Sequence, residues 1–388
     1  MEIKELARLY KQYVINMRRE FHKNPEASLK EFWTSGRIKG ELDVMGIPWV
    51  SCAGTGIIAT IEGMHEGKTI GLRADMDALE ITEANEVEYK SQNDGIMHAC
   101  GHDGHIAMLL GTAKILNECR DKIKGTVKLF FQPAEEIARG AKMMIDEGAL
   151  NGVDGVFAIH LWSGLDVGKV SVEAGPRMAA ADFFKIIIKG KSGHGSMPHQ
   201  AIDAVVAGAA CVMNLQSLVS REMNPLESVV ISVGSFHSGT RNNIIANEAL
   251  LEGTARCFNP KIRQEIPDVL ERMVKNTAAG YRAEAELRYV EGTAPTINNV
   301  ECSKLAASCV EKILSRDAVA ETEKTTGGED FSLFLEKAPG IIAFVGIRNE
   351  EKGTCYAHHH ENFNMDEDAL EIGTALYAQY AVDFLNSK

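Results

Sequence analysis

A short segment of the chain, residues 97–105, concentrates side chains that can bind metal ions. It reads Met-His-Ala-Cys-Gly-His-Asp-Gly-His, although the whole chain contains only 12 histidines. Thiolate and imidazole groups are ligands that suit zinc and its neighbours among the transition metals. Because glycine lets the backbone turn sharply, Cys100 and His102 can face the same point. A polar loop with chance histidines is the alternative, and this density of ligand types argues against it.

A second segment, residues 130–136, brings an apolar strand into a pair of carboxylates. It reads Phe-Phe-Gln-Pro-Ala-Glu-Glu. Adjacent side chains on extended backbone point in different directions, so one glutamate can bind metal while the other stands beside a metal-activated water and accepts its proton. An isolated Glu-Glu pair is more often a solvated surface pair. Its position at the end of a strand, where α/β sheets bind ligands, favours the functional interpretation.

Two further apolar strands end in polar residues of the same kind. Residues 73–77 read Arg-Ala-Asp-Met-Asp, and residues 158–160 read Ala-Ile-His. A lone histidine at a strand end is usually structural. Several polar strand ends that converge on one edge of a sheet are better explained by a common site, and we therefore predict a metal site there.

The elements that must position these residues alternate along the first half of the chain. The pattern predicts strands at 56–61, 69–75, 126–132 and 156–160, and helices at 3–21, 106–116 and 141–147. After residue 295 the chain returns to longer helices and one strand, at 340–346. Strands alternating with helices indicate an α/β fold, with a mixed sheet covered by helices on both faces.

The middle of the chain follows a different pattern. Strand, helix and strand occur twice: strands are expected at 182–189, 228–236, 248–257 and 283–290, and helices at 201–220 and 261–278. This βαββαβ order is that of a ferredoxin-like unit. We therefore predict a discontinuous catalytic domain, residues 1–180 and 292–388, with an inserted lid and dimerisation domain at 181–291.

Composition excludes some classes of protein. With 45% hydrophobic and 24% charged residues, the 388-residue chain is typical of a folded globular protein. The formal net charge of -13 argues against a nucleic-acid partner, because phosphate binding needs a basic surface. The first residues lack the apolar core of a signal peptide, and we expect no membrane-spanning segment and a cytoplasmic location. The eight cysteines are expected to be reduced.

Five motifs in a fixed order give the chain a resemblance to a known family. They are Leu-Arg-Ala-Asp-Met-Asp-Ala-Leu at 72–79, Cys-Gly-His-Asp-Gly-His at 100–105, Gln-Pro-Ala-Glu-Glu at 132–136, Gly-His-Gly-Ser-Met-Pro-His at 193–199 and Gly-Glu-Asp-Phe at 328–331. The chain resembles the dinuclear metallopeptidase family of aminoacylases and carboxypeptidases. Within it, the match is to the amidohydrolase branch of hippurate hydrolases, auxin-conjugate hydrolases and N-acetyl-diaminopimelate deacetylases, and it runs from residue 19 to the last helix.

The resemblance implies a role for each matching residue. The implied metal ligands are Cys100, His102, Glu136, His160 and His359. Glu135 matches the general base, and Asp75 matches the carboxylate that orients a ligand. The implied cofactors are two divalent metal ions per subunit, with zinc expected first and manganese, cobalt or nickel as alternatives.

Three further residues, in the inserted domain, match groups that contact the substrate. His194 matches a histidine that polarises the scissile carbonyl and that can reach the active site of a partner subunit. Asn243 and Arg256 resemble groups that bind the substrate's carbonyl and carboxylate, for which a bidentate Arg is better suited than Lys. The resemblance therefore implies a homodimer through the inserted domain, with a tetramer as the alternative.

The last metal ligand depends on the register of a histidine run. Residues 356–363 read Tyr-Ala-His-His-His-Glu-Asn-Phe. The family's histidine comes four residues before a Phe, which selects His359, leaves His360 as the alternative and makes His358 dispensable. A departure from the family is Glu80, where many relatives have Pro; it removes no ligand.

The activity implied by the resemblance is hydrolysis of the amide bond of small N-acyl amino acids. A metal-activated water would attack the acyl carbon, and Glu135 would accept its proton. A dipeptidase or carboxypeptidase could use the same site. A metal-binding scaffold without activity is a third possibility, but it would not need to retain Glu135, Asp75 and His194.

Overall fold

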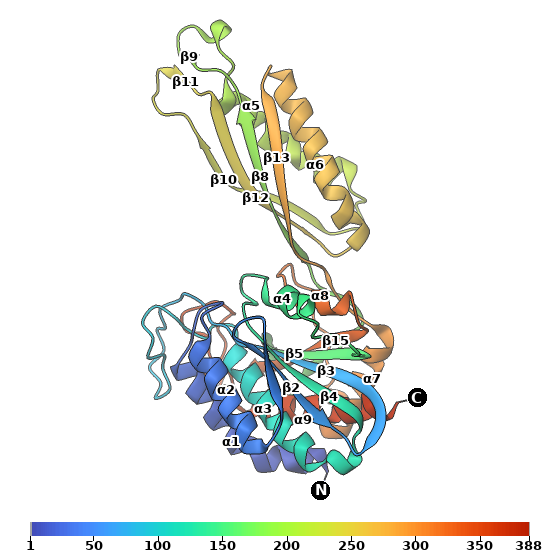
Figure 1. The fold of residues 1–388 in the computed structure, drawn as a ribbon. Helices are drawn as coiled ribbons and strands as arrows, with labels where there is room; N and C mark the ends of the chain where they lie inside the picture. Colours follow the sequence, from blue (N-terminus) through green and yellow to red (C-terminus); the bar gives the residue numbers. More distant parts are fainter. Residues whose placement is uncertain (1, 388) are drawn as a thin grey trace. The chain divides into compact units, whose positions relative to one another are not determined.

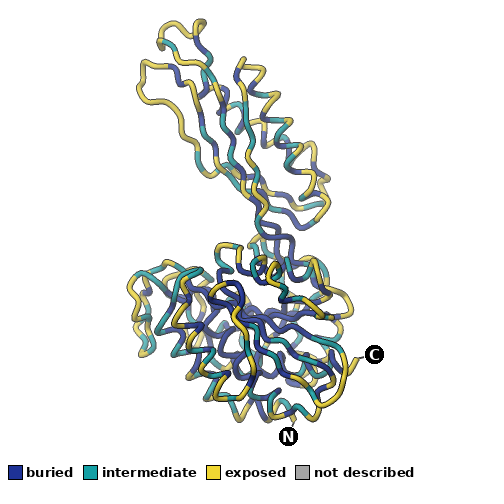
Figure 2. The backbone as a smooth tube through the Cα atoms, viewed as in Figure 1, coloured by how far each residue is buried: buried dark blue, intermediate teal, exposed yellow. Residues whose placement is uncertain are grey.

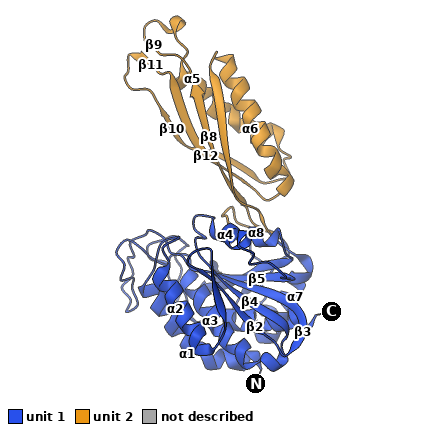
Figure 3. Cartoon of the chain, in the orientation of Figure 1, with its two compact units in different colours: residues 1–175, 297–323, 330–388 blue, residues 176–296, 324–329 orange. Residues whose placement is uncertain are grey.

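The computed structural model describes residues 2–387 and divides into two compact units (Figure 3). The first unit comprises residues 1–175, 297–323 and 330–388, and the second comprises residues 176–296 and 324–329. Each unit has its own cluster of buried apolar side chains. The buried residues of both units are the dark blue segments of the tube in Figure 2. The units are therefore described separately.

The first unit is built on a mixed sheet of seven strands, in the order β1-β2-β4-β3-β5-β15-β6 (Figure 1). Its strands are β1 (Trp49–Cys52), β2 (Gly56–Glu62), β3 (His65–Asp75), β4 (Lys124–Gln132), β5 (Gly155–Asp166), β6 (Val170–Ser171) and β15 (Gly340–Arg348). The central strands β4, β3, β5 and β15 run parallel to one another, and the outer strands are antiparallel. The carboxyl ends of the parallel strands therefore lie at one edge of the sheet.

Helices cover both faces of this sheet (Figure 1). On one face lie α1 (Ile3–Lys23), α2 (Phe32–Met45), α3 (His102–Glu118), α7 (Val300–Ile313) and α9 (Asp368–Asn386). The short helices α4 (Gly140–Asp146) and α8 (Ser332–Leu335) lie over the other face. The apolar residues of α3 form a nearly continuous buried run, because this helix lies between the sheet and α1 and α9.

The second unit is a four-stranded antiparallel sheet in the order β10-β12-β8-β13. Its main elements are β8 (Ala180–Lys189), α5 (Ala204–Ser217), β10 (Val229–Ser238), β12 (Glu248–Cys257), α6 (Pro260–Gly280) and β13 (Glu284–Thr293). Both helices pack on one face of the sheet around residues such as Ile188, Ile266 and Leu270. This order and connectivity are those of a ferredoxin-like unit, so the predicted fold class is confirmed.

Smaller elements complete the two units. They are β7 (Gly175–Met178), β9 (Gly193–His194), β11 (Ile244–Ile245) and β14 (Thr296–Asn298), which pair as β9 with β11 and β7 with β14. One segment, Ala204–Glu222, has the length and apolar composition of a membrane-crossing helix. It contains α5, which packs on α6 and on the sheet, as core helices with this composition do.

A buried ion pair joins α1 to the first turn of α3. The Nε of Arg18 donates to Oδ2 of Asp103 at 2.8 Å, and both side chains are fully buried. His22 contacts the same carboxylate oxygen through Nδ1 at 2.7 Å, and its Nε2 lies 3.2 Å from Glu83. Arg18 and His22 hold the pKa of Asp103 far below its ordinary value even though burial alone would raise it.

Candidate metal centre

The polar strand ends of the first unit meet at the carboxyl edge of the parallel strands, as this topology requires. Asp75 is the last residue of β3, and Gln132 ends β4 just before Glu135 and Glu136. The prediction that His160 ends its strand is wrong, because β5 continues to Asp166, but His160 still lies at this edge beside Cys100. The chain enters α3 through Gly101, whose φ of 97° is in the left-handed region that favours glycine. This turn brings Cys100 and His102 to the same edge.

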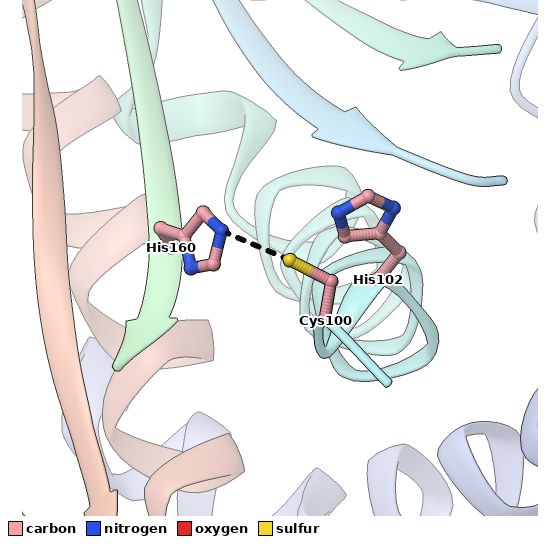
Figure 4. A group of neighbouring side chains, drawn as sticks. All are labelled: Cys100, His102 and His160. Atoms are coloured by element: carbon pink, nitrogen blue, oxygen red, sulfur yellow. Dashed lines mark hydrogen bonds between the residues drawn. The ribbon is translucent and has the colours of Figure 1, made fainter. Parts of the chain in front are cut away.

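Cys100, His102 and His160 form a buried group whose ligand atoms all lie within 4.8 Å of one another (Figure 4). The Nε2 of His160 lies 3.6 Å from the Sγ of Cys100. In Figure 4 the His160 ring projects from its strand toward the sulfur, while Cys100 and His102 come from the start of α3. A thiol and two imidazoles in this arrangement are a donor set that zinc prefers.

Glu136 extends the group toward the C-terminal part of the chain. Its Oε1 lies 3.9 Å from Nε2 of His102, and its Oε2 lies 3.6 Å from Nε2 of His359. Cys100, Glu136 and His359 also place one ligand atom each within 4.8 Å of the others. All five residues expected as metal ligands are thus brought together, with the two oxygens of one carboxylate facing two different histidines.

The three consecutive histidines point in different directions. His359 faces Glu136, and its backbone has a φ of 64°, which is uncommon for a residue with a side chain. His360 is exposed, stacks on Tyr356 and accepts a hydrogen bond from the Asn362 N–H at 3.0 Å. His358 lies against β5 instead. Of the two registers that the sequence allows, the geometry places His359 at the group of ligands.

Hydrogen bonds to carbonyl oxygens orient the two imidazoles that β5 and α3 contribute. His102 donates from Nδ1 to the carbonyl of Asp77 at 2.9 Å, and His160 donates from Nδ1 to the carbonyl of Leu161 at 2.8 Å. Both Nε2 atoms are therefore directed into the group. The Nε2 of His102 is buried and has no hydrogen-bond partner among residues 2–387. A buried polar nitrogen in this situation is compensated if it binds a cation, so the residues present fit a metal ion.

The charges of the site also favour a bound cation. Burial raises the pKa of the Cys100 thiol well above its ordinary value, and the Glu136 carboxylate raises it further. Burial alone would lower the pKa of His102, but the negative charge of Asp75 and the side chain of Asp77 raise it well above the ordinary value. Burial holds the pKa of His160 well below its ordinary value, so this ring is neutral. A cation would replace protons that the negative groups otherwise retain.

Glu135 lies beside these ligands, at the turn that follows β4. His102, Glu135 and Glu136 each place one ligand atom within 4.8 Å of the others. The turn includes Ala134, whose φ of 54° lies in the left-handed region. Such conformations are often found where surrounding contacts hold a functional segment in place. The two neighbouring glutamates therefore both reach the same site.

Asp77 holds this turn in place, a role that the sequence pattern did not reveal. Its Oδ1 accepts from the backbone N–H of Glu135 at 3.0 Å, and its Oδ2 accepts from that of Glu136 at 3.1 Å. Its own backbone carbonyl is the acceptor for His102. The available signal was its spacing, two residues after Asp75 at the end of a buried strand.

Asp75 lies behind the ligands and contacts three basic side chains. Its Oδ1 accepts from Nδ1 of His105 at 2.6 Å, and its Oδ2 accepts from Arg73 at 2.6 Å and lies 3.7 Å from Nε2 of His102. Although burial raises its pKa, Arg73, His102 and His105 hold it well below the ordinary value, so the group is a carboxylate. The second nitrogen of His105 accepts from the Leu161 N–H at 2.9 Å.

The other three predicted site residues belong to the second unit. His194 and Asn243 are both exposed and lie beside each other, where β9 pairs with β11 and the Gly195 N–H donates to the Asn243 carbonyl at 2.9 Å. Arg256 is half-buried in β12, and burial lowers its pKa although Asp182 acts in the opposite direction. Within this unit, His194 and Asn243 are brought together.

Comparison with known proteins agrees with this geometry. A model of the peptidase family M20/M25/M40 matches residues 71–383. The chain is 42% identical to thermostable carboxypeptidase 2 of Saccharolobus solfataricus, over 99% of this chain and 98% of that protein. It is 40% identical to N-acetylcysteine deacetylase of Bacillus subtilis, over 96% and 97% of the two chains.

A solved structure gives the same result. The crystal structure of a dinuclear metal-binding peptidase of the M20 family from Bacillus subtilis superposes with a TM-score of 0.88 at 36% identity, over 98% of this chain and 100% of that one. The resemblance seen in the sequence motifs is therefore confirmed over the full length. The chain belongs to the peptidase family M20/M25/M40 and is a metal-dependent hydrolase of amide bonds.

Proposed function

We propose that this enzyme hydrolyses the amide bond of N-acyl amino acids with two divalent cations in the first unit. The residues that would hold them are Cys100, His102, Glu136, His160 and His359. The observation that carries the proposal is the position of Glu136, whose two oxygens face His102 and His359 while Glu135 stands beside it. One carboxylate between two histidines suits a pair of cations, and the adjacent carboxylate remains available for proton transfer.

The donor set favours zinc among the divalent metals, because it combines a thiol with imidazoles; manganese, cobalt and nickel are the alternatives. When bound, the cations supply Lewis acidity toward the substrate carbonyl and lower the pKa of water. The identity of the metal is part of the proposal.

The chain's own residues supply the proton transfers and the binding contacts. Glu135 accepts a proton from the attacking water and delivers it to the leaving amine. His194 donates a hydrogen bond to the carbonyl oxygen as negative charge develops on it. Arg256 binds the carboxylate of the amino acid, and Asn243 binds the substrate's carbonyl. Each of these roles places a group of the appropriate charge against one part of an N-acyl amino acid.

A carboxypeptidase activity is the second candidate, and the comparisons favour it as much as the first. The relatives at 42% and 40% identity are named a carboxypeptidase and an N-acetylcysteine deacetylase, respectively. Both names describe cleavage of an amide bond whose amine belongs to an amino acid. The two candidates differ in the acyl part of the substrate, which a substrate panel can separate.

The test of the function is release of free amino acid from a panel of N-acetyl and N-benzoyl amino acids and of peptides with free carboxylates. The zinc-loaded enzyme is expected to prefer the N-acyl amino acids. Glu135→Gln should retain its metal and lose roughly a hundred- to ten-thousand-fold in kcat, because only the proton acceptor is removed. Metal analysis accompanies each assay. Loss of metal from Glu135→Gln would show that Glu135 is a ligand, and a preference for peptides would favour the carboxypeptidase.

The raised pKa of the Cys100 thiol predicts a pH-dependent affinity for zinc. Both Cys100 and His102 must lose a proton to bind a cation, so affinity should fall as pH falls, by roughly tenfold per pH unit for each proton released. Cys100→Ser should weaken binding and reduce this slope by about one proton. Competition with a chromophoric chelator between about pH 6.5 and 8.5 measures both quantities. Cys119→Ser is the buried control; equal slopes in Cys100→Ser and the parent would contradict the assignment.

The histidine run gives a third prediction. His359→Ala should lose zinc and activity because its imidazole faces Glu136, whereas His360→Ala should retain both because its ring lies on Tyr356 at the surface. Bound metal per chain and kcat are measured for the two variants side by side. The reverse result would shift the ligand assignment to His360.

We also propose a homodimer through the second unit. Support comes from exposed apolar residues on α5, which are Val205, Val206 and Met213, and from the unpaired edge of β10. In this dimer His194 of one chain would complete the site of the other, since it lies on an exposed two-stranded ribbon.

Subunit mixing tests this arrangement. His194→Ala and Glu135→Gln should each be nearly inactive as pure dimers, and mixing them under conditions of subunit exchange should restore measurable activity. In a mixed dimer, one site contains both a native Glu135 and a native His194. If no activity returns although exchange is demonstrated, His194 acts within its own chain.

A further inference from the structure

The backbone N–H and carbonyl of Leu161, next to His160 in β5, together contact three histidines. Its N–H donates to Nε2 of His105 at 2.9 Å. Its carbonyl oxygen accepts from Nδ1 of His160 at 2.8 Å and from Nε2 of His358 at 2.9 Å. The backbone N–H and carbonyl of one residue, Leu161, therefore join β5, α3 and the C-terminal histidine run.

These bonds determine where each ring carries its hydrogen. A carbonyl oxygen only accepts, so His160 must carry hydrogen on Nδ1 and His358 must carry it on Nε2. Since the Leu161 N–H only donates, Nε2 of His105 is an acceptor, and its Nδ1 donates to Asp75. With Nδ1 bonded to the carbonyl, the His160 ring directs Nε2 toward the sulfur of Cys100, which lies 3.6 Å away.

The His358 side chain makes contacts through both ring nitrogens and through the ring itself. Its Nδ1 lies 3.0 Å from the hydroxyl of Ser163, so both ring nitrogens are occupied. The ring also packs against Trp162 and Phe363, with centroid distances of 5.0 and 5.3 Å, and meets the His160 ring edge-on at 5.2 Å. A side chain with this many contacts cannot turn without moving its own backbone.

The next residue in the chain depends on that backbone. His359 has a φ of 64°, a conformation that residues with side chains adopt only when the surroundings hold it. Its N–H donates to the carbonyl of Ala99 at 2.8 Å, beside Cys100. His359 is thus held by one hydrogen bond of its own and by the anchored residue that precedes it.

We propose that His358 is a positioning residue for the metal centre. It holds the Leu161 carbonyl that orients His160, and it holds the strained backbone that directs His359 toward Glu136. This inference rests on the proposed cation centre and contradicts the expectation from the sequence that His358 is dispensable. His358 itself does not bind the cation, because both of its nitrogens are occupied by Leu161 and Ser163.

Two substitutions separate the hydrogen bond from the packing. His358→Phe keeps an aromatic ring between Trp162 and Phe363 but removes the donor to Leu161. His358→Gln keeps a donor on a side chain of similar reach. His360→Ala is the control, since it changes the neighbouring histidine on the exposed side.

The experiment measures the zinc dissociation constant of the full-length protein by competition with a chromophoric chelator. His358→Phe is expected to bind zinc roughly 10- to 100-fold more weakly than the parent, His358→Gln to recover part of that loss, and His360→Ala to bind as the parent does. Visible absorption of the cobalt-substituted proteins gives a second readout. The ligand-field bands should shift in His358→Phe, because the orientation of His160 and His359 changes, and not in His360→Ala.

Far-UV circular dichroism establishes that each variant is folded. If His358→Phe is not folded, the zinc affinity of His358→Gln relative to the parent tests the proposal. A folded His358→Phe that binds zinc within about twofold of the parent, with an unchanged cobalt spectrum, would overturn the proposal. So would a His358→Gln variant that binds zinc no better than His358→Phe. If the parent protein bound no zinc, the proposed function would be wrong as well. Zinc binding by the parent therefore distinguishes failure of the inference about His358 from failure of the proposed function.

Discussion

Negative charge is buried at the carboxyl edge of the parallel strands, and the structure of the first unit depends on the groups that compensate this charge. Asp75 and Asp77 are both fully buried there, and Glu136 is half-buried beside the thiol of Cys100. Buried charges are tolerated only when they are paired and hydrogen-bonded. Arg73, the histidines of α3 and two backbone N–H groups compensate part of this charge. A cation among the remaining donors would compensate the rest of this charge. The fold of this edge and the binding of a metal therefore depend on the same buried groups.

The same principle explains how the ligands are held before any metal binds. The ligating nitrogens are directed by hydrogen bonds from the opposite side of each ring to backbone carbonyls, of Asp77 for His102 and of Leu161 for His160. Behind them, the pair of Arg18 and Asp103 anchors the first turn of α3 to α1. The carbonyls that set these directions lie in β5 and just after the end of β3, two strands that pair in the sheet, so the geometry of the site follows from the register of the sheet.

The three consecutive histidines at 358–360 differ in role because each one makes different contacts. Three identical side chains in sequence are distinguished only by what each one meets: a carbonyl and a hydroxyl for His358, a carboxylate for His359, and solvent with Tyr356 for His360. The left-handed backbone of His359 separates the directions of its two neighbours. Comparable left-handed residues, Ala134 and Ala138, occur in the turn that carries Glu135 and Glu136. Three of the six non-glycine residues with positive φ in the described part of the chain thus lie in the two loops that deliver side chains to the metal centre.

The sequence by itself determined the family, the fold class and the main elements. Long periodic segments depend on local patterns of apolar residues, so the predicted strands at 69–75 and 126–132 lie within β3 and β4, and the predicted helix at 106–116 lies within α3. It also indicated that Cys100, His102, Glu136 and His160 would converge, because the carboxyl ends of parallel strands share an edge. Only the tertiary structure shows that His359, and not His360, faces Glu136, and only it revealed the contacts of Asp77, His105 and His358. Those outcomes depend on a positive φ and on hydrogen bonds between residues tens to hundreds of positions apart, and neither leaves a periodic signal in the chain.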